Sequence, residues 1–385
     1  DTSGSGTVTP PAPTALFRTG YPGDNNIVET PTRIVYFYND QMCYYNKLDG
    51  ENYIFCFDPL CDHQDTRKCL SYRFWQIGLG LQNFEYCAFN NRFYALRGQK
   101  LCSFSFDGSD LKVDYSFGEN GGWDEYLYNT WGLYHLGVYD RYVYMITIDS
   151  ETGERQLMRY DVAAGQMRNL SENKGNIMDY MFGYDTLYLM VQTEESTGMY
   201  RADLELSTIE PVSGMNSTSA DGIFDGERFY YLECRYDYNA DTGSIETTPI
   251  YISIYDPQSG EISRIYEIED GIVLMLLAVT EDAVYFTKLE PVYIGYIMTK
   301  YGKQETYNST SRIYRMDKDG GNVTVILDDL HYGTVDLYVS DSMILINGTY
   351  YIPGEGDVKS SRAVFIGTLD ADGMITGLEM TNPIG

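Results

Sequence analysis

Three cysteines and one histidine lie close together in the sequence, at Cys56, Cys61, His63 and Cys69. Thiolate sulfur and imidazole nitrogen are the donors that a tetrahedral structural zinc ion takes in proteins. The spacing matches no standard zinc finger, and exported proteins often oxidise neighbouring thiols. The segment therefore predicts a zinc site, a disulfide from Cys61 to Cys69 or Cys56, or free thiols in an anaerobic setting.

A second group of candidate residues is aromatic and falls in two segments, 118–131 and 290–301. Its members are Trp123, Tyr126, Tyr128, Trp131, Tyr293 and Tyr296. Aromatic faces beside carboxylates and amides suit the apolar faces and hydroxyls of a sugar, and they suit a peptide as well. The alternative is that the rings of the first segment pack beneath their own loop. We expect the second segment to form an extended hairpin.

Known catalytic signatures are missing from the sequence. It has no Gly-x-Ser-x-Gly elbow, no His-Glu-x-x-His motif and no phosphate-binding loop. A glycoside hydrolase or lyase needs only two suitably separated carboxylates, and the 56 acidic residues do not single out a pair. The remaining cysteines fall in expected strands and are predicted to be small buried apolar residues; they are Cys43, Cys87, Cys102 and Cys234.

The net charge of the chain restricts the chemical class of partner that it can bind. The 385 residues include 27 Lys and Arg against 56 Asp and Glu, which gives a net charge of −29. Nucleic acid is excluded as a partner because a phosphate backbone is bound by clustered basic residues. We expect a neutral or cationic partner, such as a glycan, a peptide or a surface protein, and a monomeric protein.

The elements that must position these residues are strands. Aromatic residues make up 15% of the chain and there are 37 glycines, a composition typical of pleated strands joined by tight turns. An apolar strand core, centred on Tyr in six of its seven copies, recurs at intervals of 42 to 59 residues: 34–37, 93–95, 143–145, 187–189, 229–231, 284–286 and 343–345. Such spacing predicts an all-β, seven-bladed β-propeller, with six or eight blades as alternatives.

Most copies of the core are followed by an alternating strand that ends in Asp and a turn containing Gly. Because neighbouring strands of a blade are antiparallel, the turns after the first and third strands lie on one face of the ring. The connections after the second and fourth strands lie on the other face. All five long connections belong to that second face, where binding function usually resides; they are 58–83, 118–133, 235–249, 290–311 and 351–361.

The segment 311–324 resembles a blade unit of a bacterial propeller domain of unknown function. That domain is likened to TolB and to the propeller of lipoprotein-receptor-related proteins. The resemblance implies a propeller in an exported lipoprotein of anaerobic Gram-positive bacteria. Residues 1–14, rich in Ser, Gly, Thr and Pro, then form a disordered tether ahead of a single domain at 15–385.

These observations favour an extracytoplasmic protein at the cell surface, which contacts the membrane only through a removed lipid anchor. We expect a non-catalytic β-propeller that binds a ligand or protein. The alternative function is a carbohydrate-active enzyme, a glycoside hydrolase or lyase, that uses carboxylates in the central channel. Zinc is the one cofactor that these residues suggest, with Cys56, Cys61, His63 and Cys69 as its ligands. Either the metal or a disulfide would cross-link and order the loop that enters the second blade.

Overall fold

The structure is a computed structural model. It describes residues 27–38, 41–56, 58, 60–64, 69, 71, 86–97, 100–106, 109–117, 136–148, 152–172, 174–183, 185–193, 197–215, 222–239, 244–269, 273–289, 292–300, 302–308, 312–328, 332–340, 342–352 and 359–381. The expected tether at 1–14 lies outside these residues. Within them, no helix is long and apolar enough to cross a bilayer.

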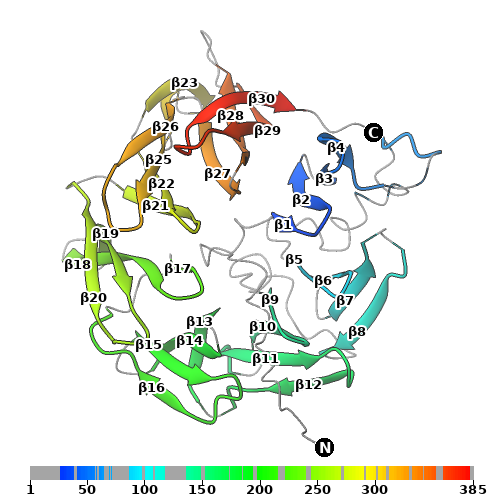
Figure 1. Ribbon diagram of the computed structural model, residues 1–385, viewed down its shortest axis with the longest axis vertical. Coiled ribbons are helices and arrows are strands. Elements are labelled where there is room, and N and C mark those ends of the chain that lie inside the picture. Colours follow the sequence, from blue (N-terminus) through cyan, green and yellow to red (C-terminus); the bar gives the residue numbers. More distant parts are fainter. Residues whose placement is uncertain are drawn as a thin grey trace, which may run out of the picture.

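The described strands form seven four-stranded antiparallel sheets and one two-stranded sheet. The seven sheets are blades set around a ring, and the first strand of each is nearest the centre (Figure 1). The chain therefore folds as an all-β, seven-bladed β-propeller, which confirms the blade number predicted from the strand cores. Each blade follows simple meander order, and in all but the sixth its four strands are consecutive in the chain.

The strands of blades 1 to 4 are listed in chain order. Blade 1 contains β1 (Val28–Glu29), β2 (Arg33–Tyr38), β3 (Gln41–Asn46) and β4 (Glu51–Ile54). Blade 2 contains β5 (Tyr86–Phe89), β6 (Arg92–Arg97), β7 (Lys100–Ser105) and β8 (Lys112–Ser116). Blade 3 contains β9 (Leu136–Tyr139), β10 (Tyr142–Ile148), β11 (Arg155–Asp161) and β12 (Gln166–Asn169). Blade 4 contains β13 (Asn176–Phe182), β14 (Thr186–Gln192), β15 (Thr197–Asp203) and β16 (Ile209–Pro211).

The remaining three blades have longer central strands or an insertion. Blade 5 contains β17 (Gly222–Phe224), β18 (Phe229–Asn239), β19 (Ser244–Tyr255) and β20 (Ile262–Glu267). Blade 6 contains β21 (Val273–Val279), β22 (Ala283–Leu289), β25 (Arg312–Asp317) and β26 (Thr324–Asp328), with the pair β23 (Val292–Thr299) and β24 (Gly302–Asn308) inserted after β22. Blade 7 contains β27 (Tyr332–Val339), β28 (Met343–Ile352), β29 (Lys359–Leu369) and β30 (Ile375–Thr381).

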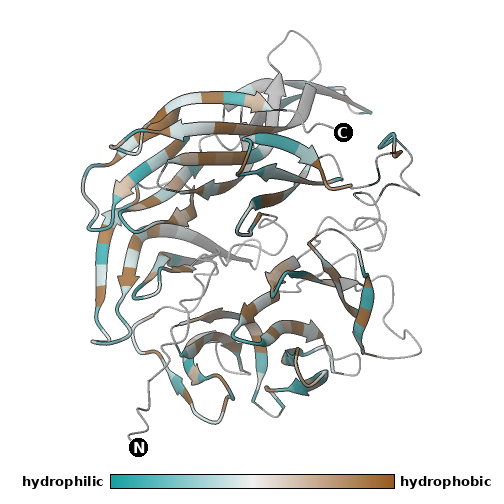
Figure 2. Ribbon diagram, turned by 45° about the vertical axis from the view of Figure 1, so that its right-hand side comes forward, coloured by the Kyte–Doolittle hydropathy of each residue, from teal (hydrophilic) through white to brown (hydrophobic). Residues whose placement is uncertain are grey.

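All seven predicted strand cores are the second strands of the blades, β2, β6, β10, β14, β18, β22 and β28. The residue at the centre of each core is almost completely buried, for example Tyr36 and Tyr144 at 0% exposure. The apolar core consists of seven separate clusters, each between two neighbouring blades. Hydrophobic residues are concentrated in the strands and hydrophilic residues in the turns (Figure 2). The fold is therefore held by blade-to-blade packing.

The predicted positions of the other cysteines are mostly confirmed. Cys43, Cys102 and Cys234 are buried in strands, whereas Cys87 in β5 is only half-buried and packs at the interface of blades 2 and 3. At this position the sequence pattern overestimated burial.

The ring closes through side chains between blade 7 and blade 1. Each of these blades is made from its own end of the chain, and no described strand is shared between them. Tyr36 and Cys43 of blade 1 pack with Leu345 and Val364 of blade 7. The Asn52 side-chain amide donates a hydrogen bond to the Thr381 hydroxyl at 2.9 Å. Among the described residues, closure therefore rests on these side-chain contacts.

The two faces of the ring differ in their connections. We call one the turn face: it carries the connections from first to second strand, of two to four residues, and from third to fourth strand, of four to six. The opposite hairpin face carries the connections from second to third strand and from blade to blade. On the hairpin face the ladder between β18 and β19 has 11 residue pairs and the ladder between β28 and β29 has ten, against six or seven in blades 1 to 4.

Segments 235–249 and 351–361 therefore differ from the expectation of long loops. The structure pairs residues 235–239 with 244–248, and residues 351–352 with 359–360, as continuations of the blade strands. Pro249, which has no N–H to donate, lies opposite Cys234 beside a register shift in the β18–β19 ladder, as expected for proline within a sheet. The extended hairpin expected in segment 290–301 is confirmed as the pair β23 and β24.

Candidate metal centre and hairpin face

The candidate metal centre lies in the loop that leaves β4, the last strand of blade 1. Phe55 anchors the start of this loop by packing against Phe93 of blade 2, with ring centroids 5.7 Å apart. Cys56 is the next residue, so its sulfur starts from a fixed point at the interface of two blades. None of the four candidate ligands lies in a strand. The backbone there is free of ladder geometry and the four side chains converge.

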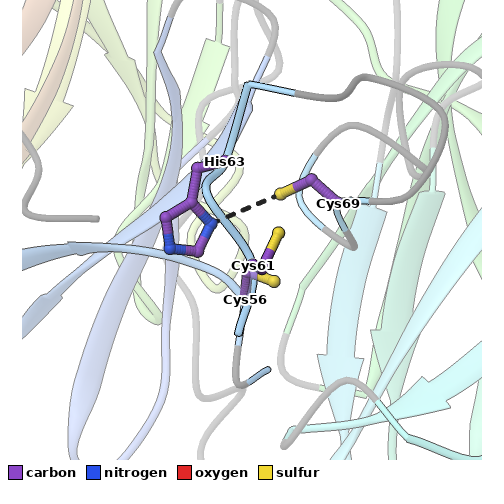
Figure 3. Close-up of side chains that lie close together, drawn as sticks. All are labelled: Cys56, Cys61, His63 and Cys69. Atoms are coloured by element: carbon purple, nitrogen blue, oxygen red, sulfur yellow. Dashed lines mark hydrogen bonds between the residues drawn. The ribbon is translucent and has the colours of Figure 1, made fainter. Parts of the chain in front are cut away.

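The four side chains meet at one point. The three sulfurs and a ring nitrogen of His63 all lie within 4.8 Å of one another. The sulfurs of Cys56 and Cys61 lie side by side, and the His63 ring faces the Cys69 sulfur (Figure 3). The Cys69 Sγ and His63 Nδ1 atoms are 3.5 Å apart. Cys69 is fully buried and the other three are half-buried. Cys61 and Cys69 are thiols in this structure.

Local hydrogen bonds shape the loop that presents these ligands. The Asp58 carboxylate accepts the N–H of Leu60 at 2.9 Å, and the Asp58 carbonyl accepts the N–H of Cys61 at 3.1 Å. His63 has a φ of 56°, in the left-handed region that most side chains avoid. The tight turn and this backbone angle direct the imidazole towards the sulfurs.

Two further residues connect the loop to blade 1. The Gln41 side-chain amide, on β3, lies 3.4 Å from both the His63 carbonyl and the Ser71 hydroxyl. The Ser71 hydroxyl is 2.9 Å from the Cys69 sulfur. Such outer contacts orient metal ligands in proteins. The sequence analysis identified neither residue. Gln41 precedes the cluster by 15 positions and belongs to no motif. For Ser71, the only available signal was its position two residues after the last cysteine.

The electrostatics of the cluster are those of crowded thiols. The backbone N–H of His63 hydrogen-bonds the Cys61 sulfur and lowers the pKa of that thiol. Burial and the neighbouring Cys56 and Cys69 oppose this effect, and the net result raises the pKa of Cys61 to about 11. Three adjacent thiolates repel one another unless a cation lies among them.

The hairpin face presents a different chemistry. On β23 the Tyr293 side chain is 50% exposed and Met298 is 64% exposed. Tyr296 is half-buried, and the Lys303 ammonium of β24 lies 4.0 Å from the centroid of its ring. Tyr296 thus makes a cation–π contact within the hairpin, and the exposed parts of Tyr293 and Met298 add apolar surface.

No protein-family model matches the sequence, and no curated protein sequence matches it. Solved structures do match. An oligogalacturonate lyase from Vibrio parahaemolyticus aligns with a TM-score of 0.53 and 8% identity, over 92% of this chain and 91% of that one. TolB from Acinetobacter baumannii aligns with a TM-score of 0.38 and 13% identity, over 93% and 79%. A chain from a study of two prolyl endopeptidases aligns with a TM-score of 0.46 and 13% identity, over 76% of this chain.

Of these, the Vibrio structure, with a TM-score above 0.5, supports a shared fold. The identity to the Vibrio structure is too low to carry more than the fold. This chain spans 42% of the length of the prolyl endopeptidase chain that it matches.

The structure brings together one of the two predicted groups of site residues. Cys56, Cys61, His63 and Cys69 form a single cluster. Tyr293 and Tyr296 lie together on the blade 6 hairpin. The other predicted ligand-binding residues lie outside the described residues; they are Trp123, Tyr126, Tyr128 and Trp131.

Proposed function

We propose that the protein is an extracytoplasmic, surface-anchored β-propeller that binds a neutral or cationic ligand on its hairpin face without catalysing a reaction. The observation that carries the proposal is the one-sided lengthening of three consecutive blades. The β18–β19 ladder is about four residues longer than those of blades 1 to 4, or roughly 13 Å at the rise of a strand. Blade 7 is lengthened similarly, and blade 6 carries β23 and β24 there.

Strand order alone places these additions on the same face. Each is inserted between the second and third strand of its blade, and the blades are neighbours in the ring. The exposed Tyr293 and Met298 belong to the middle addition. Tyr and Met are enriched at protein interfaces because they contribute large contact area. The hairpins thus supply a raised surface with apolar contacts on a rigid ring.

Charge supports the class of ligand. The net charge of −29 repels polyanions at distances up to the Debye length of about 8 Å at physiological salt. Oligogalacturonate, the substrate named for the Vibrio structure, is a polyanion, so its lyase activity is a poor match for this chain. A glycan without acidic sugars, a basic peptide or a basic patch on a surface protein fits better.

The test begins with the whole chain on glycan and peptide arrays at physiological ionic strength, followed by calorimetry on each hit. Two double variants remove candidate contact side chains: Trp123→Ala with Trp131→Ala in the segment between β8 and β9, and Tyr293→Ala with Met298→Ala on β23. We expect at least one pair to weaken binding by about tenfold or more. Asp161→Asn and Asp256→Asn, in turns on the opposite face, are the controls and should bind normally.

Two results would contradict the proposal. One is full binding by both double variants together with loss of binding in Asp161→Asn or Asp256→Asn, which would place the site on the turn face. The other is turnover of a glycan hit, which would establish the alternative of a carbohydrate-active enzyme. The proposed location has its own test: biotinylation of intact producing cells with a membrane-impermeant reagent should label the protein.

A further inference from the structure

We propose that Cys56, Cys61, His63 and Cys69 hold one structural zinc ion that fastens the loop between blades 1 and 2. This inference does not depend on the proposed ligand-binding function. Its basis is the convergence of four soft donors on one point, all within 4.8 Å of one another, from a segment of 14 residues. Three thiolates with one imidazole are a known donor set of structural zinc.

The number of converging groups favours a metal over a disulfide. A disulfide would join only two sulfurs, so it would not explain why the third sulfur and the imidazole lie at the same point. In the structure Cys61 and Cys69 are thiols, and the His63 Nδ1 atom lies only 3.5 Å from the Cys69 sulfur. A single ion at the centre explains the position of all four side chains.

The surroundings of the ligands are those of a built site. The Ser71 hydroxyl lies 2.9 Å from the Cys69 sulfur, and the Gln41 amide holds both the Ser71 hydroxyl and the His63 carbonyl. Gln41 and Ser71 are themselves buried, at 9% and 0% exposure. These contacts fix the ligands from the side of blade 1, as outer-shell groups do at zinc sites.

The ligand count indicates a structural role. Four protein donors fill a tetrahedral zinc ion and leave no position for substrate or water, whereas catalytic zinc keeps one position open. The position of the site in the fold indicates which part of the ring the zinc ion would stabilise. Blade 1 has the shortest described first strand, β1 with two residues, and it lies at the closure of the ring. Zinc on the loop after β4 would fasten the outer side of this blade.

The test uses the whole chain, produced with added zinc and purified without chelator under mild reduction. Elemental analysis should find about one zinc per chain. Counting thiols after removal of reductant should give all seven cysteines in denaturant. In the native protein, adding a strong zinc chelator should expose three further thiols and lower the melting temperature. Cobalt substituted for zinc should show the visible absorption of a tetrahedral thiolate complex.

Variants separate the site from general effects of cysteine loss. His63→Ala and Cys61→Ser should each lower zinc affinity by about tenfold or more and abolish the effect of chelator on the melting temperature. Cys87→Ala, outside the cluster, is the matched control and should keep full zinc. If Cys61→Ser does not fold, the zinc affinity of His63→Ala and the cobalt spectrum of the unmodified chain still test whether the cluster binds metal.

Two outcomes would overturn the proposal. Two fewer thiols than seven in denaturant, with the matching loss of two hydrogens in the mass, would show a disulfide. A full thiol count with less than about a tenth of a zinc per chain, after incubation with zinc salt, would show that the cluster binds no metal.

Discussion

The two faces of the ring are built differently. On the turn face, the turns between the third and fourth strands have four to six residues and lie against the preceding blade. On the hairpin face, the strands of blades 5 and 7 and the inserted hairpin of blade 6 extend away from the ring. The turn face is fastened by side chains. Arg33 of blade 1 donates to the Phe106 carbonyl of blade 2 at 2.8 Å. Arg159 of blade 3 pairs with Glu205 of blade 4. On the hairpin face, the backbone N–H of Arg155 in blade 3 donates to the Asn176 side-chain oxygen in blade 4 at 2.7 Å, and the loop with the candidate metal centre leaves blade 1.

The same arrangement explains the recurring Asp and Gly of the turns. Asp256 and Asp370 accept backbone N–H groups within their own turns. Gly320 of blade 6 approaches the backbone of blade 5, and Gly373 of blade 7 approaches Arg315 of blade 6. Together with the proposed function, the contrast assigns stability to the turn face and binding to the hairpin face. Variants on the turn face should therefore change stability, and variants on the hairpin face should change binding.

The largest expected effect is that of Gly320→Ala on the turn face. Gly320 has a φ of +92°, and an added Cβ would lie 1.9 Å from the Ile265 carbonyl oxygen of blade 5. Backbone strain and overpacking together should lower the free energy of unfolding by about 3 kcal/mol, measured by urea denaturation. Gly260→Ala is the control: its φ is +74° with no atom within 4 Å, so only about 1 kcal/mol should be lost. Equal losses would show that the blade contact is unimportant.

The next effect concerns the ion pair between blades 5 and 6. The Lys318 ammonium lies 2.6 Å from the Asp225 carboxylate, whose side chain is 6% exposed. Burial raises the pKa of Asp225, but Lys318 and the N–H groups of Arg228 and Glu227 outweigh burial and hold it below its ordinary 3.8. Lys318→Met leaves this carboxylate without its cation and should lower the free energy of unfolding by about 2 kcal/mol at pH 7.

The pH dependence follows from the direction of that shift. Asp225 has a lowered pKa in the folded state, so its contribution is fully present above the ordinary value of 3.8 and is lost as the pH falls through the folded pKa. The difference between Lys318→Met and the unmodified chain should shrink over that range. Arg312→Met breaks the exposed pair with Asp328 within blade 6 and should change stability by less than about 0.5 kcal/mol. A pH-independent difference would assign the effect to lost packing.

A similarly small change in stability is expected for Tyr293→Ala with Met298→Ala on the hairpin face. Both side chains are at least half exposed, so the unfolding free energy should change by only about 0.5 kcal/mol. Urea denaturation of the double variant beside Gly320→Ala measures the contrast directly. A loss comparable to that of Gly320→Ala would mean that the hairpin also holds the ring together.

The sequence predicted the second strands well because their signal is local. An apolar–Tyr–apolar core alternates with period two and buries its centre between blades, as Tyr36 and Tyr144 do. The ligand cluster was also predictable because its four members lie within 14 residues. β1, with two residues, is too short to give a pattern. The extension of the β18–β19 ladder and the contact of Gln41 with the loop depend on pairing and packing across the fold, which no local pattern encodes.

The central claim, that the hairpin face binds and the turn face stabilises, is tested most directly by removing residues 290–310 and joining Leu289 to Ser311 through Asn-Gly. The β22–β25 ladder ends at Lys288 opposite Arg312, so a two-residue turn closes it. The variant should unfold within about 1 kcal/mol of the unmodified chain and lose its ligand signal on the glycan and peptide arrays. An unfolded variant, or a stable one that keeps every array signal, would contradict the account.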